Sequence, residues 1–177
     1  FLARFSTIKG PDLAIEACRK VGVGLDLVGD TSITNEPEYF QQCREKCDGS
    51  QIRMVGPAKR GECVWWFSQA HCMLHPNMRF REPFGLAPVE AMAGGCPVIA
   101  WDYGAMRETI KDGETGLLVN SMDQLENAVK KFAIFQDEPK AKGTREACRE
   151  WASQFSIQNM VNRYEELCFD AVETGGW

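Results

Sequence analysis

Signals for several classes of protein are missing from this sequence. Lys and Arg total 20 against 25 Asp and Glu, which gives a net charge of −5. Nucleic acids and anionic membranes attract basic surfaces, so we expect no nucleic-acid partner. The longest apolar run, residues 86–101, is interrupted by Glu90 and two prolines, whereas a membrane-spanning helix needs about 18 apolar residues in succession. We therefore predict no transmembrane segment, and no signal peptide is recognisable.

Metal-binding and dinucleotide-binding signatures are missing as well. The chain has eight Cys and two His but no Cys-x-x-Cys pair, so a zinc site is disfavoured. Most of the cysteines fall in apolar, periodic segments, which favours buried, reduced thiols over disulfides. No Gly-x-Gly-x-x-Gly follows the first expected strand, and a dinucleotide-dependent oxidoreductase therefore has no support.

The remaining composition is that of one globular domain. The chain has 177 residues, of which 44% are apolar and 25% charged, and such a length can bury about 70% of the unfolded surface. It begins with Phe1 instead of Met, within an expected strand. We therefore expect it to be a piece of a longer protein.

Strand-like and helix-like segments alternate along the chain. Strands are expected at residues 1–5, 25–28, 51–55, 72–74, 97–100 and 117–119. Helices are expected at 11–21, 36–48 with Asn35 as the cap, 60–70, 85–93, 109–110, 122–135, 138–155 and 157–172. This alternation predicts an α/β fold, a doubly wound parallel sheet of Rossmann-like type with helices on both faces. The last helix carries an apolar stripe, which either packs in the core or docks elsewhere.

The loops after the strands are where we expect a ligand, because such sheets bind ligands beyond the carboxyl ends of their strands. These loops contain Arg4, Lys9 and residues 77–84. Gly85 follows and opens a helix, where free N–H groups and the helix dipole favour a phosphate. An anionic ligand is therefore compatible with the overall negative charge.

Two carboxylates accompany this helix start. Glu90 lies about one turn inside the helix, where it can accept two hydrogen bonds from a vicinal diol such as ribose. It stands within an apolar helix, so we expect it to need a polar partner. Glu82 lies in the preceding loop and could reach hydroxyl groups beyond the phosphates. His75 precedes a proline at a strand end and is interpreted as structural.

Four ordered blocks in this chain resemble a known family. The blocks are Arg4 with Lys9-Gly10, the Glu-x7-Glu motif of Glu82 and Glu90, EAMAGGCPVIA at residues 90–100, and a Gly-containing run at 104–119. Together they resemble the C-terminal, donor-binding domain of a retaining glycosyltransferase of family 4, which has the two-domain GT-B architecture. The resemblance covers nearly the whole chain.

The resemblance implies a phosphate site built from separate parts of the chain. Arg4 and Lys9 match the cations that neutralise the nucleotide diphosphate, and both are therefore catalytic candidates. The backbone of Phe84, Gly85 and Leu86 matches the segment that meets the distal phosphate.

The same resemblance implies contacts to the rest of a nucleotide sugar. Glu90 matches the carboxylate that binds ribose. Glu82 matches the carboxylate that faces the donor sugar, and it is the third catalytic candidate. Backbone groups from Arg53 to Ala58 match the segment that holds the base. Ala3 departs from the family, which usually has Gly before the first Arg.

By this resemblance, the full protein transfers a sugar from a nucleotide-diphosphate sugar to a sugar or lipid acceptor. Residues 1–177 would be the donor-binding domain, and the N-terminal acceptor domain is missing from this chain, so the fragment alone is expected to be inactive. No cofactor or metal is implied, and a UDP-sugar is favoured over a GDP-sugar or an ADP-sugar. The protein is expected in the cytoplasm, either free or attached peripherally to a membrane.

Other interpretations remain open at this point. The domain could be a nucleotide-sugar binding module without activity of its own. It could also belong to a GT-B nucleotide-sugar epimerase, although such an enzyme would show a different set of carboxylates and histidines. Arg79 and Arg81 either add positive potential near the site or belong to a solvated loop.

Overall fold

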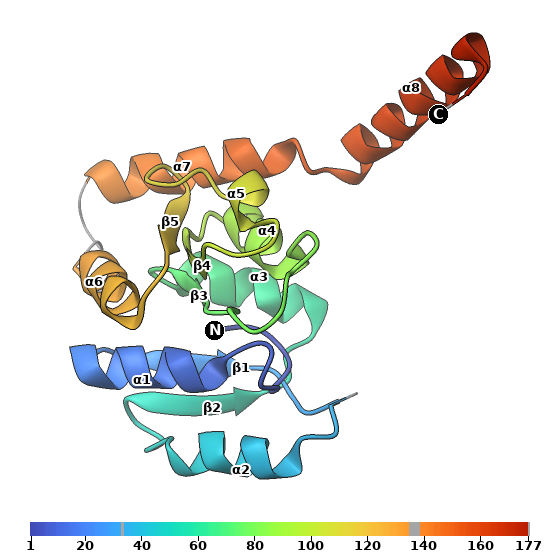
Figure 1. Cartoon of the computed structure of the whole chain (residues 1–177). Helices are drawn as coiled ribbons and strands as arrows, with labels where there is room; N and C mark the ends of the chain where they lie inside the picture. The colour runs from blue at the N-terminus through green and yellow to red at the C-terminus, as the bar shows by residue number, and fades with distance from the viewer. Residues whose placement is uncertain (33, 135–138, 177) are drawn as a thin grey trace.

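The computed structural model describes residues 1–32, 34–134 and 139–176 (Figure 1). Its elements are α1 (Pro11–Val21), β1 (Leu25–Val28), α2 (Pro37–Glu45), β2 (Ile52–Gly56), α3 (Arg60–Gln69), β3 (Met73–His75), α4 (Leu86–Ala93), β4 (Val98–Trp101), α5 (Met106–Thr109), β5 (Gly116–Val119), α6 (Met122–Ala133), α7 (Pro139–Ser153) and α8 (Ile157–Thr174). The predicted alternation of strands and helices is confirmed. The predicted helix ends at 135 and 138 lie outside the described residues.

The strands are parallel, as predicted, and they form two hydrogen-bonded groups. β1 pairs with β2, and β3, β4 and β5 form a second group with β4 in the centre. The N-terminal segment runs beside β1. There the Val28 N–H donates to the Phe1 carbonyl at 3.0 Å, and the Ala3 N–H donates to the Val28 carbonyl at 3.1 Å.

The prediction of a five-residue strand at the N-terminus is wrong. In place of a strand, this segment forms an isolated parallel bridge between Leu2 and Val28. The chain then turns, and the Phe5 N–H donates to the Asp30 carbonyl at 2.8 Å. The Phe5 side chain is fully buried, so the apolar character of this segment reflects core packing as much as strand formation.

Helices cover both faces of the strands, so the doubly wound prediction is confirmed. Along β4, Ile99 and Trp101 belong to one core, whereas Val98 and Ala100 belong to another. Successive side chains of a strand point to opposite faces, which places these two cores on opposite sides. α1 and α6 pack together, and α4 packs against α7. Each large apolar side chain buried in these cores stabilises the fold by roughly 1.5–3 kcal/mol.

α2 is shorter than predicted at both ends. Its N-cap is Glu36, not Asn35, and Pro37 occupies the first turn, where a missing N–H costs no helical hydrogen bond. The helix ends at Glu45. The Glu36 carboxylate accepts a hydrogen bond from the Thr7 N–H at 2.8 Å, which ties the start of α2 to the loop before α1.

All eight cysteines are free thiols, and the prediction that they are buried is confirmed for four of them. Cys18, Cys43, Cys96 and Cys148 are buried, and Cys168 is exposed on α8. Burial raises the pKa of Cys18 to about 11 and that of Cys96 to about 12. These thiols therefore stay protonated at neutral pH and pack as small apolar side chains.

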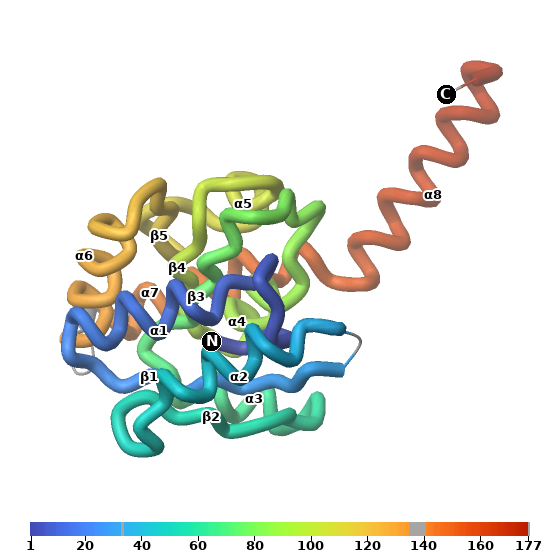
Figure 2. The backbone as a smooth tube through the Cα atoms, turned by 60° about the horizontal axis from the view of Figure 1, so that its bottom comes forward, coloured from blue at the N-terminus to red at the C-terminus, as the bar shows by residue number. Residues whose placement is uncertain are grey.

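α8 projects away from the rest of the described chain (Figures 1 and 2). It contains no buried residue, and Ile157, Leu167 and Val172 are 75%, 53% and 82% exposed. The interpretation of its apolar stripe as part of the core is therefore wrong. Across the residues that the structure describes, no helix combines the length and the apolar composition needed to span a membrane.

Candidate functional site

Two loops beyond the carboxyl ends of the strands meet at one charged contact. Lys9 lies in the loop before α1, and Glu82 lies in the loop between β3 and α4, 73 residues further along. The Lys9 Nζ and the Glu82 Oε2 are 2.5 Å apart, and the two side chains are 16% and 15% exposed. The structure therefore brings two predicted catalytic candidates together in a place from which most water is excluded.

Closely packed glycines fix both loops. Gly10 has a φ of 68°, and a Cβ at this position would lie 2.8 Å from the Pro76 carbonyl oxygen. Gly104 also has a φ of 68°, and a Cβ there would lie 2.6 Å from the Glu82 carbonyl oxygen. That oxygen accepts a hydrogen bond from the Ala105 N–H at 2.9 Å. Any other residue would be strained and crowded at either glycine, so the loop positions depend on these contacts.

A second ion pair holds the loop before α1. Arg79 donates to the Thr7 carbonyl at 2.9 Å and to the two oxygens of Asp12 at 3.0 and 2.9 Å. Tyr39 donates its hydroxyl to Asp12 at 2.6 Å. Burial acts to raise the pKa of Asp12, but the hydrogen bonds from Arg79 and Tyr39 outweigh it and hold that pKa below its usual range. Arg79 is thus an exposed residue whose guanidinium is already paired with Asp12 and joins the loop after β3 to the loop before α1.

Two buried polar residues lie on the inner side of Glu82. Asn77 donates from Nδ2 to the Glu82 Oε2 at 3.3 Å, and the His75 Nε2 lies 3.9 Å from the same oxygen. Only 3% of His75 and 2% of Asn77 is exposed. Burial, with a contribution from the Lys9 ammonium, lowers the pKa of His75 to about 4. The imidazole is therefore neutral at pH 7.

Sequence reasoning missed these two residues as parts of the site. It interpreted His75 as structural, and it included Asn77 only within the loop 77–84. The available signal was a His-Pro-Asn run at the end of a strand. Such a run does not reveal that its polar side chains become buried next to a carboxylate.

The residues at the start of α4 differ in their exposure. Gly85 is the N-cap with a φ of 87°, and the helix begins at Leu86. Leu86 is 68% exposed and Phe84 is 37% exposed, although the Phe84 ring also contacts the edge of Phe155. Amides in a first helical turn lack helical partners, and together with the helix dipole they attract anions. Of the segment predicted to meet a phosphate, Phe84 and Leu86 are thus exposed, whereas Gly85 is buried.

Arg4 and Glu90 do not join the central contact. Both are exposed, and neither forms an ion pair among the residues that the structure describes. Hydrogen bonds from Ser32 lower the pKa of Asp30, and the charge of Arg4 adds a smaller effect. α4 turns Glu90 toward water while its neighbours Val89 and Ala91 are buried, so the polar partner expected for this carboxylate is not an ion pair within the described part of the chain.

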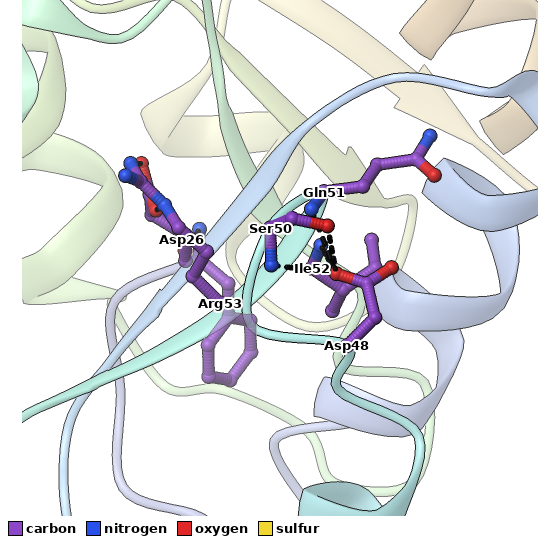
Figure 3. Close-up of polar contacts among 7 residues, drawn as sticks. Asp26, Asp48, Ser50, Gln51, Ile52 and Arg53 are labelled. Carbon is purple, nitrogen blue, oxygen red and sulfur yellow. Dashed lines mark hydrogen bonds and ion pairs between the residues drawn. The ribbon is translucent and has the colours of Figure 1, made fainter.

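The predicted base-binding segment extends along β2. Arg53 is the second residue of this strand, and it donates to the two oxygens of Asp26 at 2.6 and 2.8 Å (Figure 3). Beside it, Asp48 accepts hydrogen bonds from backbone N–H groups of residues 50–52, which lower its pKa to about 2. Ala58 follows the other end of the strand. The Arg53 side chain is therefore engaged near the amino end, and the backbone near Ala58 lies at the carboxyl end.

A cavity of about 730 Å³ opens where the strands begin. Phe1, Leu25 and Met73 line it together with Trp65 of α3. Asp26 and its partner Arg53 lie at the same cavity, whereas no other predicted site residue lines it. This apolar space is therefore separate from the Lys9–Glu82 contact.

The chemistry of the site follows from its groups. It offers the Lys9 ammonium and the Glu82 carboxylate in one contact, and α4 begins a few residues after Glu82 and carries Glu90 on its exposed side. A cation, a helix start and carboxylates suit an anionic ligand that also carries hydroxyl groups. Across residues 1–32, 34–134 and 139–176, the structure contains no group of three or more His, Cys, Asp and Glu side chains arranged to hold a metal ion.

Comparisons with known proteins give consistent findings. Residues 1–154 match the model of the family "Glycosyl transferases group 1". The chain is 29% identical to a D-inositol 3-phosphate glycosyltransferase of Corynebacterium aurimucosum over 97% of this chain and 42% of that protein. It is 28% identical to an uncharacterized glycosyltransferase of Methanocaldococcus jannaschii, over 94% of this chain and 47% of that protein.

Solved structures show the same fold. HepE of Anabaena in complex with UDP superposes with a TM-score of 0.82 at 24% identity, over 96% of this chain and 47% of that chain. Sucrose-phosphate synthase of Thermosynechococcus elongatus superposes with a TM-score of 0.75 at 27% identity, over 96% of this chain and 44% of that chain. The chain thus spans less than half the length of these four proteins.

Proposed function

Since this chain belongs to the family of glycosyl transferases group 1, as a domain with the Rossmann-like fold of a GT-B C-terminal half, we propose that it binds the nucleotide-sugar donor of a retaining glycosyltransferase. In this proposal residues 1–177 form the donor-binding domain, and a second domain outside this chain binds a sugar or lipid acceptor. The observation that carries the proposal is the Lys9–Glu82 contact, which unites two distant family motifs at the expected edge of the fold.

The main difficulty of sugar transfer is the charge that develops on the leaving diphosphate while the sugar becomes oxocarbenium-like. Lys9, Arg4 and the amides at the start of α4 would stabilise that negative charge. Preorganised donors of this kind contribute several kcal/mol in a site that excludes water. Arg4 is exposed and without an ion pair among the described residues, so its guanidinium is available to a phosphate.

The two carboxylates would position the rest of the donor. Glu90 faces solvent on α4, so both of its oxygens are free to accept the hydroxyls of a ribose. Glu82 is held through Oε2, which leaves Oε1 for a hydroxyl of the donor sugar. Correct placement of the reacting groups supplies much of the rate of such a transfer.

UDP is the nucleotide that we favour over GDP and ADP. The base would be held by backbone groups near the carboxyl end of β2, toward Ala58, since the Arg53 side chain is already paired with Asp26. HepE, which shares this fold, was solved with UDP and with UDP-glucose, and this makes UDP the first nucleotide to test. The enzyme would work in the cytoplasm, free or attached peripherally to a membrane, in keeping with its free thiols.

Thermal unfolding with added nucleotide tests the proposal. UDP, GDP and ADP are added in turn to wild type, to Glu90→Ala and to the control Glu150→Ala, which changes an exposed glutamate of α7. A ligand at 100 times its Kd adds about 2.7 kcal/mol to the free energy of unfolding. We expect UDP to raise the midpoint of wild type and the control, and to raise that of Glu90→Ala less. The absence of any shift with all three nucleotides contradicts the proposal.

A binding module without activity, or an epimerase, would also bind the nucleotide. Joining this domain to an acceptor domain and assaying sugar transfer separates these alternatives from the proposed transferase. Transfer to an acceptor supports the proposal. Epimerised donor without transfer, or binding without any turnover, contradicts it.

A further inference from the structure

Two buried polar atoms in the described part of the chain have no hydrogen-bond partner, the His75 Nε2 and the Asn77 Oδ1. Leaving such an atom unsatisfied costs about 1–3 kcal/mol, and folded proteins contain few of them. Both atoms lie on residues next to Glu82. Of the two, the His75 Nε2 can donate to a carboxylate, whereas the Asn77 Oδ1 is an acceptor and cannot. The diphosphate contacts described above do not involve this imidazole.

The Glu82 carboxylate is held from two sides through one oxygen. On the outer side, the partly exposed Lys9 ammonium lies 2.5 Å from Oε2. On the inner side, Asn77 donates to Oε2 at 3.3 Å, and the His75 Nε2 lies at 3.9 Å, too far for a hydrogen bond. A movement of about 1 Å would bring the carboxylate within hydrogen-bond distance of the imidazole.

We propose that His75 and Asn77 form a second holding position for the Glu82 carboxylate, which Glu82 adopts when a diphosphate draws the Lys9 ammonium away. This inference rests on the proposed function, because it takes the nucleotide diphosphate as the anion that attracts Lys9. His75, present as the Nε2–H tautomer, then donates to Glu82 while Asn77 keeps its hydrogen bond. The carboxylate thus stays in place as the cation leaves it.

A neutral imidazole suits this task. A carboxylate in a mostly buried place needs hydrogen bonds when its cation moves. Neutral His75 and Asn77 supply them without adding a charge that would compete with the phosphates for Lys9. His75 and Asn77 are accordingly positioning residues: they touch Glu82, and Glu82 faces the sugar.

The proposal predicts that removing the Lys9 ammonium has the same effect on His75 as binding the nucleotide. The ¹⁵N signals of the imidazole report its hydrogen bonding, and the chain has only two His, so His71 serves as the reference. We expect Lys9→Met without ligand to shift the His75 Nε2–H signal toward a stronger hydrogen bond, and UDP to produce the same shift in wild type. Glu82→Gln should suppress both shifts.

The ligand-free comparison separates the two proposals. If Lys9→Met shifts the His75 signal but UDP does not bind, the holding position stands and the nucleotide site is wrong. If Lys9→Met is folded and the His75 signal does not change, the holding position is wrong whatever UDP does. Lys9→Leu, which also removes the ammonium and offers no hydrogen-bond donor, provides the same test should the Met variant not fold.

A binding measurement tests the positioning role. His75→Asn and Asn77→Ser are titrated with UDP and with UDP-glucose, using the His71→Asn variant as the control. One lost hydrogen bond to a charged group corresponds to roughly tenfold in affinity. We expect UDP-glucose to bind about tenfold more weakly, with the affinity for UDP within twofold of wild type. Equal weakening of both ligands, or of neither, overturns the positioning role.

Discussion

Two carboxylate–cation contacts lie at opposite ends of the strands and differ in their surroundings. Lys9 and Glu82 approach to 2.5 Å at the carboxyl edge, and Arg53 and Asp26 approach to 2.6 Å near the strand beginnings. The first pair is 16% and 15% exposed, whereas the second is 53% and 30% exposed. The two ion pairs therefore have nearly equal distances but differ in their exposure to solvent. One pair is shielded from water among polar groups, and the other lies in solvent at the rim of an apolar cavity.

Burial, and not distance, therefore distinguishes the edge at which we propose that the ligand binds from the edge beside the cavity. An exposed ion pair gains little because water and salt screen it. A shielded pair is costly to break, because the remaining charge has lost its water as well as its partner. The cavity of about 730 Å³ lies beside the exposed pair, yet its walls offer few groups that could hold a diphosphate.

The largest predicted effect is on the free energy of unfolding. Lys9→Met leaves the Glu82 carboxylate mostly buried without its cation, and we expect a loss of about 2–3 kcal/mol. Arg53→Met, the matched change at the other edge, should alter stability far less. Urea unfolding of both variants provides the measurement. Equal losses of unfolding free energy in Lys9→Met and Arg53→Met would contradict the expected difference between the two ion pairs.

The second effect is a dependence of stability on pH. The folded state holds the pKa of His75 at about 4, below the unfolded value of about 6.5, so the unfolded chain takes up a proton first as the pH falls. We expect wild type to lose about 2 kcal/mol from this residue between pH 7.5 and pH 5. His75→Asn should lack this part of the loss. An unchanged pH profile in the variant would show that His75 titrates normally.

The third effect concerns nucleotide affinity. Arg4→Ala should weaken UDP binding about tenfold, since it removes a charge-assisted contact to phosphate. Arg53→Ala removes an arginine of the other edge and should leave the affinity within about twofold, a change below one kcal/mol. Isothermal titration of the two variants checks this. Similar losses in both would indicate a nonspecific charge effect.

The smallest effect is expected for the exposed pair itself. A double-mutant cycle with Arg53→Met and Asp26→Asn should give a weak coupling energy that fades as salt is raised, because the pair lies in solvent. A strong, salt-independent coupling would mean that this pair is shielded like Lys9 and Glu82.

Much of the fold could be predicted from the sequence. The strand at 25–28 and the helix beginning at residue 60 were predicted with their observed starts, because hydrophobic periodicity and Gly or Pro boundaries are local signals. The loops of Lys9 and Glu82 were expected at the same edge, because parallel topology places the loops after the strands together; the ion pair between the two side chains was not predicted.

The sequence could not show how far each polar group is buried. Glu90 stands in an apolar helix and still faces water, whereas Asn77 stands in a polar loop and is 2% exposed. Nor does an apolar stripe say what it contacts, as α8 demonstrates. These properties depend on how distant segments pack, and no local pattern encodes them.

Hydrogen exchange with and without UDP tests the central claim, that the ligand binds at the carboxyl edge. We expect slower exchange of backbone amides at residues 6–10 and 84–87, with no change at residues 24–26 and 50–53 beside the cavity. Slower exchange at the cavity segments, with none at the carboxyl edge, would contradict it.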